Sequence, residues 1–428
     1  KKSGGWSLEM IDVNNPCEGQ NNWSSSQNNH GGTPCQTNSI SRHNPDIIAP
    51  ALDRVTYEGQ NKIAIHFSEP MLTDRLMNKN TYLFSHSLQI DSITSIANDW
   101  RTVYVNLSDT LVSETVYTLT VTDTLFDCVE NAVLLQSFVT FGYATYPMEN
   151  DVIINEVLFN PKEGGVDFVE IYNRSDKIID LRFLRLSTYK NDGSMDTGKI
   201  VSPTGAQLFP QQYMVLTTQP DIVQEHYYCP YPENFISVNS FPSYYNTQGT
   251  VILLHDLEII DLFTYYESMH YPLLKSTEGV SLERINFDRK TQDNFNWHSA
   301  ASTAGYATPG YKNSSYSDNI TQTSYFEVYP ELFSPDNDGY NDNVNIAYSF
   351  PQPGYRASVY VYSVAGKKLR TLVNNQLLDT EGYFVWDGII EGNIKATVGT
   401  YIFLIEYWNL DGKVERVKKT CTLAIKFK

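Results

Sequence analysis

Residues 102–107 read Thr-Val-Tyr-Val-Asn-Leu, and residues 116–121 read Val-Tyr-Thr-Leu-Thr-Val. In both stretches apolar and polar side chains alternate, and β-branched and aromatic residues dominate. Successive side chains of a strand point to opposite faces of its sheet, so each stretch predicts a strand with one buried face. Residues 62–67 and 399–407 repeat the pattern. Because two such faces pack together as a sandwich, we expect an all-β chain.

The size and composition of the chain indicate several domains of this kind. A single core stops growing near about 250–300 residues, so a chain of 428 residues is expected to hold about three domains. The chain has 30 Tyr and 20 Phe, and its short Thr, Val and Ile runs are separated by Gly, Asn, Asp and Pro. This composition is typical of strands and turns.

The net charge of the chain disfavours negatively charged binding partners. The formal net charge is −18, from 31 basic and 49 acidic residues, and it repels nucleic acid and anionic lipid surfaces. No run of about 18 apolar residues is present, so the sequence predicts no membrane-spanning segment. The first residues lack the pattern of a signal peptide, which we expect to lie outside this sequence.

The five cysteines are sparse and lie in no zinc-binding pattern. Cys17 and Cys35 flank one loop-rich stretch and are candidates for a disulfide in an oxidising compartment. Cys128, Cys229 and Cys421 are far apart in sequence, and we expect them to be buried and unpaired.

An internal repeat sets the domain boundaries. Gly5–Ile11 matches Gly279–Ile285, and a Trp follows each at the same distance. Such a match is improbable by chance, so residues 1–43 are expected to be the C-terminal end of a domain whose complete copy ends near residue 314, in a fragment of a longer protein. The other matched pairs are Asn22–Ser25 with Asn296–Ser299 and, after one inserted residue, Thr33-Pro34 with Thr308-Pro309 and Asn38-Ser39 with Asn313-Ser314.

The segment from Ile154 to Pro161, followed by Asp167–Asn173 and by Gly279 to Pro309, resembles the lamin tail domain. The resemblance implies an immunoglobulin-like sandwich over residues 147–316. In bacteria it implies an accessory module of a secreted or surface protein. By the repeat, residues 1–43 are expected to end an upstream lamin-tail-like domain.

Two other segments resemble known modules. Residues 44–146 look like a bacterial Ig-like domain, because of Ile65–Met71 and Tyr117–Val121. Residues 325–428 follow a polar linker and are similar to the FlgD-like Ig domain. They also resemble the C-terminal sorting domains that Bacteroidetes proteins carry for type IX secretion. The features that carry this last likeness are Phe333–Asp342, Val385–Gly388 and Val398–Tyr401. Together the resemblances imply tandem immunoglobulin-like β-sandwiches.

An acidic loop is the candidate metal site. Asp336, Asp338, the carbonyl of Tyr340 and Asp342 alternate as the ligands of a calcium loop do, and Gly339 allows the sharp turn. The loop departs from that pattern because no Glu follows to complete the shell. The alternative is a turn whose Asp and Asn side chains bind nearby backbone amides.

No catalytic constellation is expected. Glu156 and Glu170 lie in neighbouring strand-like segments, and paired carboxylates can perform general acid and base catalysis. In the lamin tail family, however, these residues belong to the fold pattern. The eight His are scattered without a metalloprotease pattern, and no nucleophile motif is present.

Tyrosines in an irregular insertion are the candidate binding residues. Tyr227, Tyr231, Tyr244 and Tyr245 offer rigid, amphipathic rings that can stack on sugars or grip a peptide. The alternative is that these rings only cover a loop.

The sequence therefore predicts a non-catalytic structural or interaction protein of a Bacteroidetes-type cell envelope. It is expected outside the cell or on the outer-membrane surface, lipid-anchored through a missing N-terminus. Its expected partners are other envelope proteins or surface glycans, and calcium is its only candidate cofactor. Two alternatives stay open: a glycan- or peptide-binding adhesin, and the accessory tail of a secreted hydrolase encoded upstream.

Overall fold

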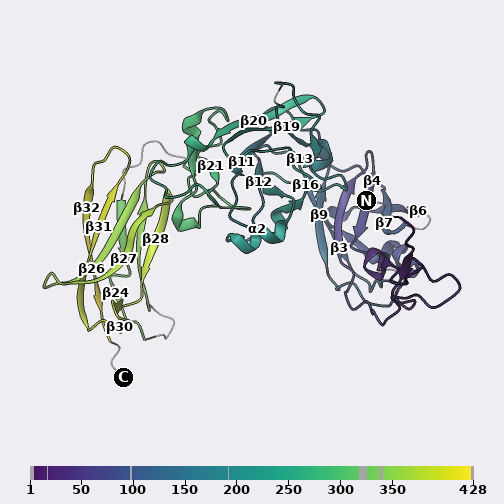
Figure 1. Ribbon diagram of the computed structural model, residues 1–428, viewed down its shortest axis with the longest axis horizontal. Helices are drawn as coiled ribbons and strands as arrows, with labels where there is room; N and C mark the ends of the chain where they lie inside the picture. Colours follow the sequence, from purple (N-terminus) through teal and green to yellow (C-terminus); the bar gives the residue numbers. More distant parts are fainter. Residues whose placement is uncertain are drawn as a thin grey trace. The chain divides into compact units, whose positions relative to one another are not determined.

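The computed structural model describes residues 4–16, 18–96, 99–190, 192–317, 325–336 and 341–425. The chain divides into two compact units, which Figure 1 colours along the sequence. Unit 1 comprises Lys1–Thr145, Lys177–Asp180 and Thr204–Gln207. Unit 2 comprises Tyr146–Asp176, Leu181–Pro203 and Leu208–Lys428.

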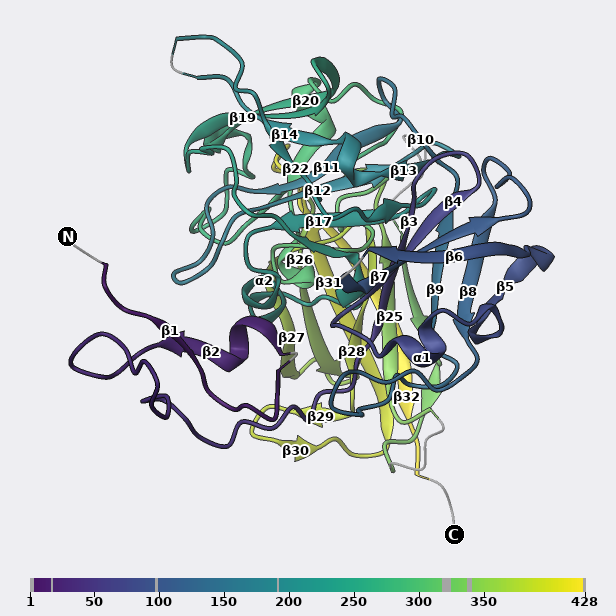
Figure 2. The ribbon, with the colours of Figure 1, turned by 90° about the vertical axis from the view of Figure 1, so that its right-hand side faces the viewer.

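Unit 1 contains a two-stranded hairpin and a sandwich. One sheet of the sandwich has the order β3-β4-β7-β6, and the other has the order β5-β8-β9; Figure 2 shows β5, β8 and β9 side by side. The elements are β1 (Leu8–Met10), β2 (Trp23–Ser25), β3 (Leu52–Tyr57), β4 (Lys62–Phe67), α1 (Thr73–Leu76), β5 (Tyr82–Phe84), β6 (Ile90–Ile96), β7 (Asp99–Leu107), β8 (Val116–Val121), β9 (Phe138–Gly142), β10 (Ala144–Thr145) and β13 (Ile178–Asp180).

The alternating stretches build the core of this sandwich. Ile63 and Ile65 of β4 and Val105 of β7 are fully buried, as are Leu119 and Val121 of β8. These side chains belong to one apolar cluster, since every second residue of each strand faces the opposite sheet.

Unit 2 begins with a second sandwich. Its larger sheet has the order β18-β17-β12-β11-β21-β22, and its smaller sheet has the order β15-β14-β19-β20. Figure 1 shows β11, β12 and β21 next to one another. The elements are β11 (Val152–Leu158), β12 (Phe168–Asn173), β14 (Arg185–Ser187), β15 (Lys199–Ile200), β16 (Gln207–Leu208), β17 (Tyr213–Thr217), α2 (Pro220–His226), β18 (Phe235–Ser237), β19 (Gln248–His255), β20 (Glu258–Tyr266), β21 (Leu282–Arg284) and β22 (Trp297–Ser299).

The first two strands of this sandwich, β11 and β12, lie at the centre of its larger sheet. Every residue of β11 and of β12 is buried, because both strands lie inside the larger sheet. Trp297 is also buried and stacks on Phe263, with ring centroids 3.6 Å apart. Its indole N–H donates to the carbonyl of Thr291 at 2.7 Å. The Trp therefore anchors the preceding loop to the core.

Unit 2 ends with a third sandwich, whose sheets have the orders β23-β25-β28 and β24-β32-β31-β26-β27. Trp386 lies at its centre, fully buried, and its rings contact Phe403 edge-on. The elements are β23 (Tyr325–Tyr329), β24 (Leu332–Phe333), β25 (Val344–Ser349), β26 (Arg356–Ser363), β27 (Lys368–Leu377), β28 (Glu381–Trp386), β29 (Ile389–Ile390), β30 (Ile394–Lys395), β31 (Gly399–Trp408) and β32 (Glu415–Leu423).

The prediction of an all-β chain of tandem sandwiches is confirmed. Helical structure amounts to α1, α2 and short 3₁₀ turns in the part of the chain that the structure describes. None of the helices described is long and apolar enough to cross a membrane. The 3₁₀ turns are η1 (Gly19–Asn22), η2 (Lys79–Thr81), η3 (Ser85–Ser87), η4 (Leu181–Phe183), η5 (Pro232–Asn234), η6 (Glu267–Met269), η7 (Asn294–Asn296) and η8 (Ser302–Ala304).

Candidate functional site

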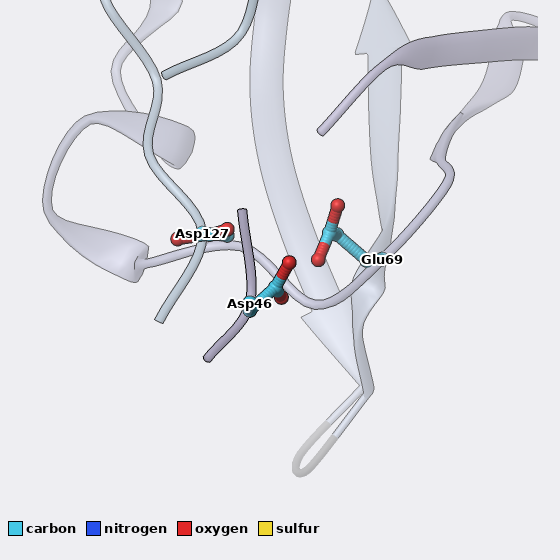
Figure 3. A group of neighbouring side chains, drawn as sticks. All are labelled: Asp46, Glu69 and Asp127. Carbon is cyan, nitrogen blue, oxygen red and sulfur yellow. The ribbon is translucent and has the colours of Figure 1, made fainter. Parts of the chain in front are cut away.

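Three carboxylates converge at one end of the unit 1 sandwich. Asp46 precedes β3, Glu69 follows β4, and Asp127 follows β8. One oxygen from each lies within 4.8 Å of the other two, and Figure 3 shows the three groups facing a common space. Sequence reasoning did not single them out because they come from three separate loops.

Hydrogen bonds hold Asp127 in place. Its side chain is fully buried. One carboxylate oxygen accepts the backbone N–H groups of Val129 and Asn131 at 2.9 and 2.8 Å. The other oxygen accepts the Asn131 side-chain amide at 2.8 Å, and that amide also donates to the carbonyl of Asp46 at 3.3 Å. The same network therefore positions Asp46 and Asp127.

The pKa of Glu69 is raised to about 7 in this cluster. Partial burial is the larger cause, and repulsion from Asp46 and Asp127 adds to it, while Arg101 opposes the shift. Either a proton or a hard cation relieves this repulsion. Calcium takes six to eight oxygen ligands, so the three carboxylates would supply only part of a shell.

We predict that titration of Glu69 in this cluster lowers the stability of unit 1 as pH rises from about 4.5 to about 7. The folded pKa of Glu69 lies above its ordinary value of 4.5, so the folded state holds its proton longer than the unfolded chain. Stability is therefore full below about pH 4.5 and declines toward pH 7. After allowance for solvent screening, we expect a loss of about 1 kcal/mol.

Calorimetric unfolding between pH 4 and pH 8 measures this effect. Glu69→Gln should flatten the profile, whereas Gln at the exposed Glu114 should leave it unchanged. An unaltered slope in Glu69→Gln would show that the cluster does not titrate in this way. Repeating the calorimetric unfolding in the presence of Ca²⁺ shows whether the cluster binds a cation in place of the Glu69 proton.

A second group of carboxylates lies inside the larger sheet of unit 2. Glu156 of β11 is paired across the sheet with Glu170 of β12 on one side and with Glu283 of β21 on the other. All three side chains are fully buried. Burial raises the pKa of Glu156 to about 8, with repulsion from Glu283 adding to it. Burial also raises the pKa of Glu170 and of Glu283.

Hydroxyl and amide donors bind these glutamates. Glu156 accepts the Ser281 hydroxyl at 2.5 Å and the Thr308 backbone N–H at 2.9 Å. The Thr308 hydroxyl lies 2.7 Å from Glu283, which also accepts the Ser314 hydroxyl at 2.8 Å.

Glu170 has two donors of its own. It accepts the side-chain amide of Asn155 at 2.7 Å and the backbone N–H of Gly310 at 2.6 Å. The three glutamates thus tie the loop that contains residues 308–315 to the centre of the sheet.

Comparison with protein families identifies two of the sandwiches. Residues 147–267 match the model of the Lamin Tail Domain, and residues 43–145 match the model of the Bacterial Ig-like domain. The chain carries a bacterial Ig-like domain and a lamin tail domain. The sheet of the lamin tail domain continues past residue 267, since β21 pairs with β11 and β22 pairs with β21.

The matching solved structures include distant ones. The N-terminal part of the bacterial S-layer protein SbsC is 17% identical, with a TM-score of 0.22, and the match covers 38% of this chain and 44% of that one. Salmonella alpha-2-macroglobulin reacted with methylamine is 11% identical, with a TM-score of 0.20 and coverages of 89% and 26%. Latent PorU from Porphyromonas gingivalis is 8% identical, with a TM-score of 0.20 and coverages of 88% and 33%.

These TM-scores are too low to establish a shared arrangement. The chain also spans less than half the length of each of these three proteins. No curated protein matches the sequence.

The acidic loop of the third sandwich is described only at its ends. Asp338 and Tyr340 lie outside the described residues, while Asp336 and Asp342 lie within them. The N–H of Ser334 donates to the carbonyl of Asn341 at 2.9 Å, which closes the base of the loop. Calcium binding here stays a prediction.

The four candidate tyrosines of the lamin tail domain lie in two environments. Tyr227 and Tyr244 are buried, and their hydroxyls donate to the carbonyls of Gly279 and Ser187. Burial leaves the faces of these two rings no room to stack on a ligand. Tyr231 and Tyr245 are about half exposed, so only they are placed to contact a partner.

The cysteines correct two expectations. Cys35 is an exposed free thiol, so the expected bond between Cys17 and Cys35 is wrong; Cys17 itself lies outside the described residues. Cys128 is disulfide-bonded, so the expectation that it is unpaired is also wrong. Sequence spacing does not reveal which cysteines come within bonding reach in space. Cys421 is buried and free, as expected, whereas Cys229 is free but only half-buried.

Proposed function

We propose that the protein is a non-catalytic structural or interaction protein of the bacterial cell surface. In this role, tandem sandwiches place binding surfaces at a distance from the envelope, and other envelope proteins or surface glycans bind to them. The bacterial Ig-like domain and the lamin tail domain, which follow one another in the sequence of one acidic chain, support this role.

The observation that carries the proposal is the burial and hydrogen bonding of the three lamin tail glutamates. A hydrolase that used paired carboxylates would need them open to substrate and water. Glu156, Glu170 and Glu283 are instead fully buried, and neighbouring hydroxyl and amide groups bind them. Their contacts serve the fold, which supports a non-catalytic role.

The disulfide supports an extracytoplasmic location. Cys128 is disulfide-bonded, and such bonds persist mainly in oxidising compartments, such as the periplasm and the cell exterior. The net charge of −18 keeps such a chain soluble and away from anionic lipid.

We further propose that the third sandwich is a FlgD-like domain of the type IX sorting class, and that the envelope is of the Bacteroidetes type. The segment Val385–Gly388, on which the resemblance rests, has a structural role. Trp386 fills the core, and its indole donates to the carbonyl of Ile389 at 2.8 Å. Gly388 has φ of +76°, and a Cβ atom at this position would lie 3.0 Å from the Pro335 side chain. Both features favour glycine.

Affinity purification from the native cell envelope, followed by mass spectrometry, tests the proposal. We expect stable co-purification of outer-membrane proteins together with peptides from residues 325–428. Recovery of the protein alone, with those terminal peptides missing, would instead favour an exported adhesin or hydrolase tail with a cleaved sorting domain.

A further inference from the structure

The β1–β2 hairpin of unit 1 reproduces the β21–β22 hairpin of the lamin tail domain. Leu8 faces Ser25 and Met10 faces Trp23 across the first hairpin. In the second, Leu282 faces Ser299 and Arg284 faces Trp297. The two hairpins therefore have the same register at matched sequence positions.

The loops that follow the two hairpins make the same contacts at matched positions. The Asn38 amide donates to the carbonyl of Met10 at 2.9 Å, and the Asn313 amide donates to that of Arg284 at 2.9 Å. Glu9 accepts the hydroxyls of Thr33 and Ser39 at 2.7 and 2.8 Å. Glu283 accepts those of Thr308 and Ser314 at the same two distances.

The hairpins differ in what covers them. β21 pairs along its other edge with β11, so that Val157 lies opposite Leu282. Among the described residues, β1 pairs with β2 alone. The exposed fraction of Leu8 is 67%, against 0% for Leu282. For Trp23 it is 43%, against 4% for Trp297, and for Trp6 it is 57%, against 3% for Val280.

We propose that the free edge of β1 and its apolar face accept an extended strand of the β11 type. The occupant we name is a strand of the same polypeptide that precedes residue 1, because β11 precedes its own hairpin in the lamin tail domain. A second copy of this chain fits less well. Its β11 is buried at every position and already paired on both edges, so donating it would break a folded sandwich.

The complete copy also defines the sequence of the occupant. Glu156 lies opposite Glu283 and is followed by Val157 opposite Leu282. The docked strand should therefore carry a Glu opposite Glu9 and then an aliphatic residue opposite Leu8. Ser7 and Thr33 occupy the positions of Ser281 and Thr308, which bind Glu156. They are placed to receive the incoming carboxyl group.

A peptide with the sequence of residues 151–160, flanked by lysines for solubility, is the probe. Added to the 428-residue protein, it should bind saturably and shift tryptophan emission to the blue, because it covers Trp6 and Trp23. Amide hydrogen exchange of the hairpin should slow at the same time. Leu8→Lys should weaken binding at least about tenfold, and so should Lys in the peptide at the position of Val157.

A matched control separates docking from general adhesion. Leu83 of β5 is also exposed, at 60%, and Leu83→Lys should leave the peptide affinity unchanged. Both substitutions replace an exposed Leu, so neither should unfold the protein. The proposal is overturned if the peptide does not bind, or if Leu8→Lys and Leu83→Lys have the same effect. Neither result bears on the cell-surface role.

Discussion

Replacing Arg284 by Met will destabilise the lamin tail domain by about 3–5 kcal/mol. The guanidinium is buried and lies 3.1 Å from the carboxylate of Asp261, which is buried as well. It also donates to the carbonyl of Ile154 at 2.8 Å. Removal of the cation leaves the Asp261 charge without its partner in the core. Urea unfolding measures the loss as a shift of the midpoint.

Two further variants make this prediction specific. Arg284→Met combined with Asp261→Leu should recover part of the loss, because no unpaired charge remains in the core. Lys190→Met, which breaks a largely exposed ion pair with Asp196 in the same domain, should cost less than about 1 kcal/mol. Equal losses for Lys190→Met and Arg284→Met would contradict the importance of burial.

The lamin tail domain will lose stability as pH rises from about 4.5 to about 8, and Glu156→Gln will suppress much of that loss. The folded pKa of Glu156 is about 8, against an ordinary value of 4.5. Stability is therefore full below about pH 4.5 and is lost as pH rises through 8, by about 3–5 kcal/mol for a fully buried group.

The glutamine is expected to fit because it keeps the shape of the side chain. Its carbonyl can accept from Ser281 and Thr308 as Glu156 does, and it carries no charge to repel Glu283. Urea unfolding at pH 5, 7 and 9 measures the difference. Gln at the exposed Glu225 is the control. A pH profile of Glu156→Gln as steep as that of the natural protein would refute the account.

Much of the fold could be predicted because the alternation of apolar and polar residues along a short stretch shows which side chains of a strand are buried. The apolar residues at the start of β11 are buried, as a continuous apolar run predicts. Alternate residues of β7 and β8 lie in the core, as an alternating pattern predicts. Glu156 and Glu170 were expected to serve the fold pattern, and their buried hydrogen bonds show how.

The candidate sites were less predictable because they depend on contacts between distant loops. Asp46, Glu69 and Asp127 converge from three loops, and no local spacing marks them. The Ile65–Met71 stretch, which contains Glu69, indicated a bacterial Ig-like domain and not a carboxylate cluster. Tyr227 and Tyr244 looked like binding residues in an irregular insertion, but apolar burial placed both in the interior.

Labelling of intact cells tests the proposed surface role most directly. A lysine reagent that does not cross membranes is applied to the bacterium before and after lysis, and the labelled peptides are identified. We predict that Lys190 and Lys413, whose side chains are 51% and 79% exposed, are labelled on intact cells as strongly as after lysis. Labelling of both lysines only after lysis would contradict a location on the cell surface.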